Sequence, residues 1–229
     1  LRTYTMTQIE SELKQLKQAV VEMMELAGIQ VEKARDAFMS HNSELAEEVV
    51  HNETRMNAYE LSIDRDCENL FALYHIVATD LRFAISSLKI NSDLERIGDY
   101  ADGIADYVVE MDKPFEKDLL EKTEIQQMFD LIVSMMDDVC EGFENKDNET
   151  VRKVFKKDHT INKINVKAAD RLTQIISDEP TKVTQALYLF STIKKLERVG
   201  DHIKNIAENI IFYREAEVLK HKKQNKKNE

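Results

Sequence analysis

Apolar residues recur every three or four positions along most of the chain, which is the spacing of one face of an α-helix. One such run is Leu13, Leu16, Val20, Met23 and Ala27, and another is Leu187, Phe190, Ile193 and Leu196. Only two prolines occur, and both fit a helix start or a linker. The pattern predicts six long helices at about residues 6–40, 44–74, 79–111, 117–145, 148–177 and 180–217.

One motif occurs twice. The segment Leu94-Glu95-Arg96-Ile97-Gly98-Asp99 recurs 102 residues later as Leu196-Glu197-Arg198-Val199-Gly200-Asp201. Further upstream the two halves match at an offset of 105 residues, where Glu53 corresponds to Asp158 and Asn57 to Asn162. A unit of about 105 residues is long enough to bury its own core. We therefore predict an all-α fold of two similar antiparallel three-helix bundles that arose by internal duplication.

The repeat also predicts the domain organisation. The first bundle takes residues 1–112 and the second takes residues 116–219, with a junction near Lys113 and Pro114. The last ten residues, 220–229, contain five lysines and no apolar residue. We expect them to form a disordered basic tail.

Composition excludes several classes of protein. The formal charge is −11, 42% of the residues are hydrophobic, and the chain has only 5 Gly and 2 Pro. A disordered chain would contain fewer apolar residues, and an all-β protein would need more turn residues. An acidic chain repels the phosphates of nucleic acid, so we expect no nucleic-acid partner.

The chain also lacks the signals of membrane insertion or export. No apolar run reaches the length of about 18–20 residues that a membrane span needs, and the start of the chain lacks the order of a secretion signal. Cys67 and Cys140 have no metal-type spacing, so we expect reduced thiols. These features predict a cytoplasmic protein.

Acidic residues form a stripe on each helix that carries the motif. The stripe of the first half is Glu95, Asp99, Asp102 and Asp106, and that of the second half is Glu197, Asp201 and Glu208. Lys204 replaces the third acid of the second stripe. Both stripes lie on the side of the helix opposite its apolar residues. The preceding helix adds Glu53, Asn57, Glu60 and Asp64 in the first half, and Asp158, Asn162 and Asn165 in the second.

Such stripes need compensation, because like charges one turn apart cost about 0.2–0.5 kcal/mol per pair. Basic side chains on a neighbouring helix or a bound cation would supply it. Oxygen ligands with little His or Cys suit Mg, Ca, Mn or Fe better than a closed zinc site. A single acidic pair is usually a solvated helix face, but its recurrence in one context favours a shared site. Gly98 and Gly200 each cost a helix about 1 kcal/mol relative to Ala, which predicts a close approach of neighbouring backbone there.

The doubled Leu-Glu-Arg-x-Gly-Asp motif, in an all-helical chain of this length, resembles the PhoU family of phosphate-uptake regulators over residues 6–217. The resemblance implies two bundles side by side, with multinuclear metal sites of iron or zinc at their surface. Mg or Mn are the alternatives that the ligand chemistry allows. The ligands implied are Glu53, Asn57, Glu95, Asp99, Asp106, Asp158, Asn162, Glu197, Asp201 and Glu208. Asn57 and Asn162 depart from the family pattern, which often has Asp there, and an amide brings no charge.

The resemblance also implies a function. Members of this family are regarded as cytoplasmic, non-enzymatic negative regulators of phosphate uptake and of the phosphate-starvation response. The partners implied are the ATPase of a phosphate ABC transporter and a sensor histidine kinase. The protein would be peripheral to that membrane complex and would form a homodimer.

Two other functions remain open on the residues alone. One is a carboxylate-bridged metalloenzyme, because clustered carboxylates can hold two metals and activate water. Glu48-Val49-Val50-His51 carries the Glu-x-x-His signature of di-iron bundles, but Lys153 and Lys156 stand at the corresponding positions of the second half. The other is a metal-free helical adaptor whose acidic stripes bind a basic partner surface.

Overall fold

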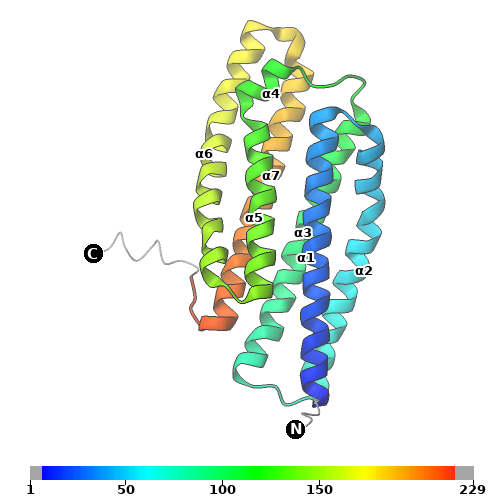
Figure 1. Cartoon of the computed structure of the whole chain (residues 1–229). Coiled ribbons are helices and arrows are strands. Elements are labelled where there is room, and N and C mark those ends of the chain that lie inside the picture. Colours follow the sequence, from blue (N-terminus) through cyan, green and yellow to red (C-terminus); the bar gives the residue numbers. More distant parts are fainter. Residues whose placement is uncertain (1–6, 220–229) are drawn as a thin grey trace, which may run out of the picture.

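The computed structural model describes residues 7–219, and all regular structure in that range is helical (Figure 1). The elements are α1 (Gln8–Ser40), α2 (Ser43–Leu73), α3 (Ala78–Glu110), α4 (Lys117–Thr123), α5 (Ile125–Asn145), α6 (Asn148–Asp178), the 3₁₀ turn η1 (Pro180–Lys182) and α7 (Val183–Glu215). Helices α1–α3 form one antiparallel bundle, and α5–α7 form a second bundle beside it. The predicted fold class is therefore confirmed, whereas the predicted tail at 220–229 lies outside the described residues.

Five of the six predicted helices are found with ends close to those expected, but the helix predicted at 117–145 is broken. Glu124 adopts a left-handed conformation with φ 58°, which separates α4 from α5. The buried Thr123 hydroxyl donates a hydrogen bond to the Leu119 carbonyl at 2.8 Å, and Arg171 of α6 pairs with the Glu124 carboxylate. Neither glycine nor proline marks this break, and the hydrophobic pattern continues through it, so the sequence predicted one unbroken helix.

The turn between the first two long helices of each bundle is built in the same way. His41 and Lys146 end α1 and α5 in left-handed conformations, with φ values of 52° and 58°. The next residues, Asn42 and Asp147, cap α2 and α6 by accepting hydrogen bonds from two backbone N–H groups each. The duplication therefore extends to the turn chemistry, because these pairs are 105 residues apart.

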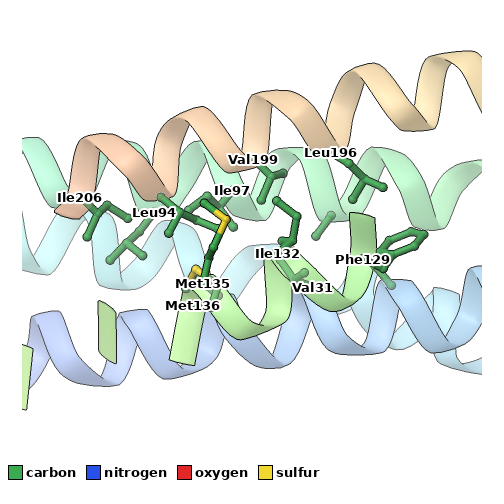
Figure 2. Packing of buried hydrophobic residues seen from close by; sticks show 14 of the residues in the cluster. Val31, Leu94, Ile97, Phe129, Ile132, Met135, Met136, Leu196, Val199 and Ile206 are labelled. Atoms are coloured by element: carbon green, nitrogen blue, oxygen red, sulfur yellow. The ribbon is translucent and has the colours of Figure 1, made fainter. Parts of the chain in front are cut away.

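The two bundles share one hydrophobic core. Helix α1 packs against α5, and α3 packs against α7. Side chains from both bundles meet between these helices, and Figure 2 labels Val31, Leu94, Ile97, Phe129, Ile132, Met135, Met136, Leu196, Val199 and Ile206. Burial of one such side chain contributes about 1.5–3 kcal/mol to folding. Because the core is continuous, the domain limits at 112 and 116 remain a prediction, although residues 113–115 do fall between α3 and α4.

Polar contacts also join α3 to α7. The Asp93 carboxylate of α3 accepts hydrogen bonds from His202 at 2.8 Å and from Asn205 at 3.2 Å. Farther along the same pair of helices, the hydroxyls of Tyr107 and Ser191 lie 2.7 Å apart. These contacts fix the register of the two motif-bearing helices relative to each other.

None of the helices within residues 7–219 combines the length and apolar character that a bilayer crossing requires. In the same range the two cysteines are free thiols, as predicted.

Candidate metal centre

The two repeated glycines lie where the paired acidic helices of each bundle contact each other. A Cβ atom on Gly98 of α3 would lie 3.4 Å from the Met56 side chain of α2, and one on Gly200 of α7 would lie 3.4 Å from Ile161 of α6. The predicted approach of backbone is therefore wrong, because side-chain atoms are the nearest neighbours. Met56 and Ile161 are equivalent in the repeat, so both halves place the two acidic helices in the same register.

In the first bundle, the outer part of the stripe is bridged by an arginine. Arg96 contacts Glu95 at 3.4 Å and Asp99 at 3.0 Å. Burial, followed by the charge of Asp99, raises the pKa of Glu95 above its usual range, and Glu60 of α2 adds to this effect. Asn57, three residues before Glu60 on α2, is exposed. This part of the stripe is therefore a partly buried group of acids whose charge is compensated, among the described residues, by Arg96 alone.

Asp102 is the most perturbed acid of the first bundle. Burial, followed by the charges of Asp106, Glu53 and Asp99, raises its pKa to about 6, against a smaller opposing effect of Lys195. Its Oδ1 atom is buried and has no hydrogen-bond partner among the described residues. A buried carboxylate oxygen without a partner costs about 1–3 kcal/mol, so this group favours a donor or a cation.

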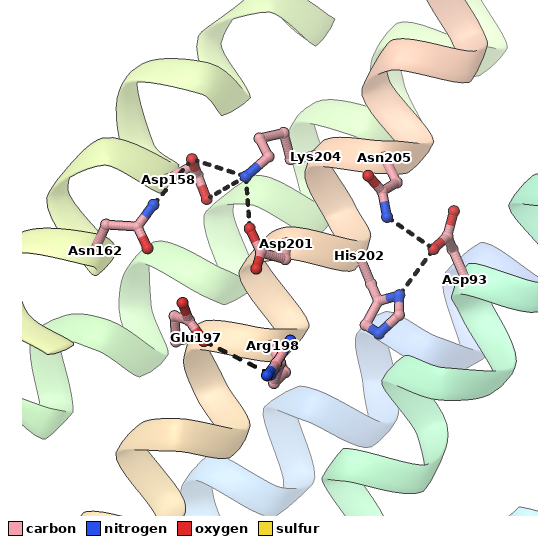
Figure 3. A network of polar contacts seen from close by, with 9 residues as sticks. All are labelled: Asp93, Asp158, Asn162, Glu197, Arg198, Asp201, His202, Lys204 and Asn205. Carbon is pink, nitrogen blue, oxygen red and sulfur yellow. Dashed lines mark hydrogen bonds and ion pairs between the residues drawn. The ribbon is translucent and has the colours of Figure 1, made fainter. Parts of the chain in front are cut away.

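In the second bundle, a lysine compensates the repulsion between neighbouring carboxylates (Figure 3). Lys204 of α7 lies 3.3 Å from Asp158 of α6 and 2.5 Å from Asp201 of its own helix. Asn162 donates a hydrogen bond to Asp158 at 3.2 Å. Burial lowers the pKa of Lys204, but the hydrogen bond and charge of Asp201 and the charge of Asp158 outweigh this effect and raise it overall.

The remaining predicted ligands of the second bundle are Glu197 and Glu208. Glu197 contacts Arg198 at 4.0 Å. Glu208 lines a cavity of about 130 Å³ together with Lys89 and Phe212. Asp158 is only 8% exposed, whereas its counterpart Glu53 is exposed, so the two halves are not equivalent in burial.

The donor sets of the two halves therefore differ in their fit to a metal. Within residues 7–219, no group of three or more His, Cys, Asp or Glu side chains is arranged so that it could hold a metal ion. The chemistry of the first bundle suits a hard cation better, because the Asp102 oxygen is buried without a partner and the charges of three further carboxylates act on that group. The second bundle fits less well, because an ammonium group already contacts its two carboxylates.

A family model described as the PhoU domain matches residues 20–108 and 125–210, one segment in each bundle. The chain belongs to the PhoU family. A relative from Aquifex aeolicus named phosphate-specific transport system accessory protein PhoU homolog is 32% identical over 210 residues, which cover 92% of this chain and 94% of that protein. A relative of the same name from a Burkholderia species is 28% identical over 216 residues, covering 94% and 92% of the two chains.

Solved structures agree with this assignment. The crystal structure of PhoU from Pseudomonas aeruginosa superposes with a TM-score of 0.83 at 27% identity and covers 92% of this chain and 100% of that one. The phosphate transport system regulatory protein PhoU from Streptococcus pneumoniae gives a TM-score of 0.79 at 27% identity and covers 93% of this chain and 99% of that one.

Two residues matter more in this PhoU-family chain than the resemblance alone suggested. Asp102 belongs to the acidic stripe but was not among the implied ligands, although its buried oxygen lies within the acidic group. Lys204 is visible in the sequence as a departure from the repeat. The sequence does not reveal that its ammonium group reaches Asp158 on another helix, because that contact depends on the packing of α6 against α7.

Proposed function

We propose that this chain is an accessory protein with a regulatory role in a phosphate-specific transport system. The observation that carries the proposal is similarity over nearly the whole chain, and over more than nine-tenths of two relatives named phosphate-specific transport system accessory protein PhoU homolog. In the finer form of the proposal, the protein is a cytoplasmic, non-enzymatic negative regulator of phosphate uptake and of the phosphate-starvation response. It links the ATPase of a phosphate ABC transporter to a sensor histidine kinase.

Deletion of the gene tests the regulatory part. We expect phosphate-responsive transcripts and phosphate uptake to stay high in phosphate-rich medium, where the intact strain keeps both low. Complementation with the wild-type gene is the control and should restore the low levels. Transcript and uptake levels that do not change on deletion would contradict a negative regulatory role.

The partners and the homodimer form a separate clause. We expect purified chain to retain the transporter ATPase and the cytoplasmic part of the kinase on an affinity column, and to elute with the mass of a dimer in light scattering. A monomeric mass with retention of neither partner would contradict this clause. It would not contradict the regulatory role, which the deletion tests separately.

We also propose that the first bundle holds metal, with iron or zinc as the expected ions and Mg or Mn as alternatives. The residues that would hold it are Glu53, Asn57, Glu95, Asp99, Asp102 and Asp106. The support is the chemistry of the donor set and the buried Asp102 oxygen without a partner. A bound cation would neutralise acids of both α2 and α3 and so strengthen the contact between these helices.

Metal analysis of untagged protein tests this clause. The Asp99→Asn/Asp102→Asn variant should contain less metal than the wild type after both are equilibrated with Fe, Zn, Mn or Mg. Because these substitutions keep the side-chain size and one carbonyl oxygen in each residue, they remove charge with little change in packing. Equal metal content in the two proteins would contradict the clause and favour a metal-free adaptor.

A further inference from the structure

We propose that Lys204 is a built-in cation that takes the place of metal in the second bundle, so that this chain binds metal through its first bundle only. The inference rests on the metal clause proposed above and deepens it. It concerns Asp158, Asn162, Glu197, Asp201 and Glu208, which the family resemblance alone would make metal ligands. The carrying observation is the position of one ammonium group between two helices.

Lys204 stands at the position of Asp102 in the repeat, 102 residues later. The equivalence holds in three dimensions, because Gly98 packs against Met56 and Gly200 packs against Ile161 at the same distance of 3.4 Å. The register of each helix pair is thus preserved across the duplication. The exchange of an acid for a base therefore occurs at one place within the same local architecture.

The contacts of Lys204 are those of a cation in a carboxylate site. Its Nζ atom lies 3.4 and 3.3 Å from the two oxygens of Asp158 and 2.5 Å from Asp201. The Lys204 side chain is 27% exposed and that of Asp158 is 11% exposed, so the pair is largely shielded from water. A shielded ion pair is stronger than a surface pair, because screening by solvent is weaker.

The charges of the two halves explain why metal is excluded from one of them. In the second bundle, Lys204 offsets the charge of Asp158 and Asp201, and Asn162 contributes a neutral amide. A divalent ion would have to displace the ammonium group from both carboxylates or bind beside another positive charge. In the first bundle, Arg96 is the only described basic residue in an ion pair with the stripe, and it contacts Glu95 and Asp99 but not Asp102. The charge of Lys195 of α7 also acts on Asp102, but its effect is smaller than those of the surrounding acids.

The consequence is a division of labour between the bundles. The contact between α6 and α7 is stabilised by the ammonium group of Lys204, which is part of the chain itself, so it does not depend on bound metal. The α2–α3 contact lacks this internal cation and is the one that a metal would strengthen. Loss of metal should therefore loosen the first bundle and leave the second unchanged.

Metal content of the full-length protein tests the inference in two steps. First, wild type and the Asp158→Asn/Asp201→Asn variant are equilibrated with Zn, Mn or Fe, and bound metal per chain is measured after removal of free ions. We expect equal metal content, whereas Asp99→Asn/Asp102→Asn loses most of it. A loss in Asp158→Asn/Asp201→Asn as large as that in the first-bundle variant would overturn the inference.

Second, Lys204→Asp restores the acid of the first repeat and should raise bound metal by about one ion per chain. Adding Asp158→Asn to this variant should abolish the gain. Lys204→Met removes the charge and keeps a side chain of similar length. Lys163→Gln removes the charge of an exposed lysine of α6 and is the matched control. Circular dichroism and the thermal midpoint, with and without metal, confirm that each variant is folded before its metal content is compared.

The two proposals fail in different ways. If wild type binds no metal but Lys204→Asp gains it, the first-bundle clause is wrong and the role of Lys204 stands. If folded Lys204→Asp and Lys204→Met both bind no more metal than wild type, Lys204 does not exclude metal, and this inference is overturned whatever the first bundle binds.

Discussion

Met56 of α2 packs against Gly98 of α3, with its side chain 3.4 Å from the place that a Cβ atom would take. That distance is an ordinary van der Waals contact rather than a clash. Ile161 stands in the same relation to Gly200 in the second bundle. The helices are therefore close together at the repeated glycines but still leave room for one methyl group, and this gives the first prediction.

Gly98→Ala should leave stability unchanged or raise it by up to about 1 kcal/mol, because Ala favours a helix interior over Gly by about that amount. Urea unfolding followed by circular dichroism measures the change in free energy. Gly98→Leu is the matched comparison and should destabilise the protein, since its larger side chain has to displace Met56. A clear loss of stability in Gly98→Ala would mean that the helices cannot separate even slightly.

Gly142→Ala should behave in the opposite way. A Cβ atom there would lie 2.9 Å from the backbone carbonyl oxygen of Asp147 and would overlap the Val151 side chain. Backbone at a capped turn cannot move as easily as the end of a flexible side chain, so we expect a loss of about 1–3 kcal/mol. The same unfolding measurement applies, and Gly28→Ala, with 3.9 Å to Met136, is the control that should be well tolerated.

Both thiols should be unreactive in the folded protein. Burial and, to a smaller extent, nearby acids raise the pKa of Cys67 and of Cys140 to about 12. At pH 8 only about one thiol in ten thousand is then ionised, and the thiolate is the reactive form. An aromatic disulfide reagent should label neither residue in buffer and both in denaturant. Rapid labelling of Cys140 in buffer would show that reagent enters the cavity of about 310 Å³ that it lines with Met24 and Met136.

The hydrophobic period predicted most of the fold because long amphipathic helices bury one continuous stripe. It failed at Glu124, where Leu119, Leu120 and Ile125 keep the pattern although the chain turns. The break depends on a buried hydroxyl and on an ion pair with α6, which are contacts between distant residues. Local periodicity contains no information about either contact.

The candidate site was predictable to a similar extent. Helical spacing placed Asp99 and Asp102 on one stripe, and the charge of Asp99 does act on Asp102. The two helices of the first half that carry oxygen ligands, α2 and α3, were expected to be adjacent and are in contact. The sequence could not show which acids would be buried or where a long lysine side chain would end. Asp158 and Glu53 are equivalent by sequence, yet only Asp158 is buried and contacts an ammonium group.

Asp93 should be important for the contact between the bundles. Its carboxylate accepts hydrogen bonds from His202 and Asn205 of α7. Asp93→Ala leaves these partly buried donors without a partner, for an expected loss of about 1–3 kcal/mol in unfolding free energy. Ser191→Ala, which removes the contact with Tyr107 on the same pair of helices, is the comparison and should cost less. Equal and negligible effects would mean that apolar packing alone holds α3 to α7.

The cap of α6 should make the stability of the second bundle dependent on pH. The Asp147 carboxylate accepts hydrogen bonds from the Thr150 hydroxyl and from the N–H groups of Thr150 and Glu149, and these bonds lower its pKa below the ordinary value of 3.8. A lowered folded-state pKa stabilises the fold above pH 3.8, and this contribution is lost as the pH falls through the folded-state value. Asp147→Asn reproduces the Asn42 cap of the first bundle and cannot ionise. Thermal midpoints measured from pH 7 down to pH 2 should therefore fall less steeply in Asp147→Asn than in wild type, whereas identical slopes would show that the charge of Asp147 contributes nothing to the cap.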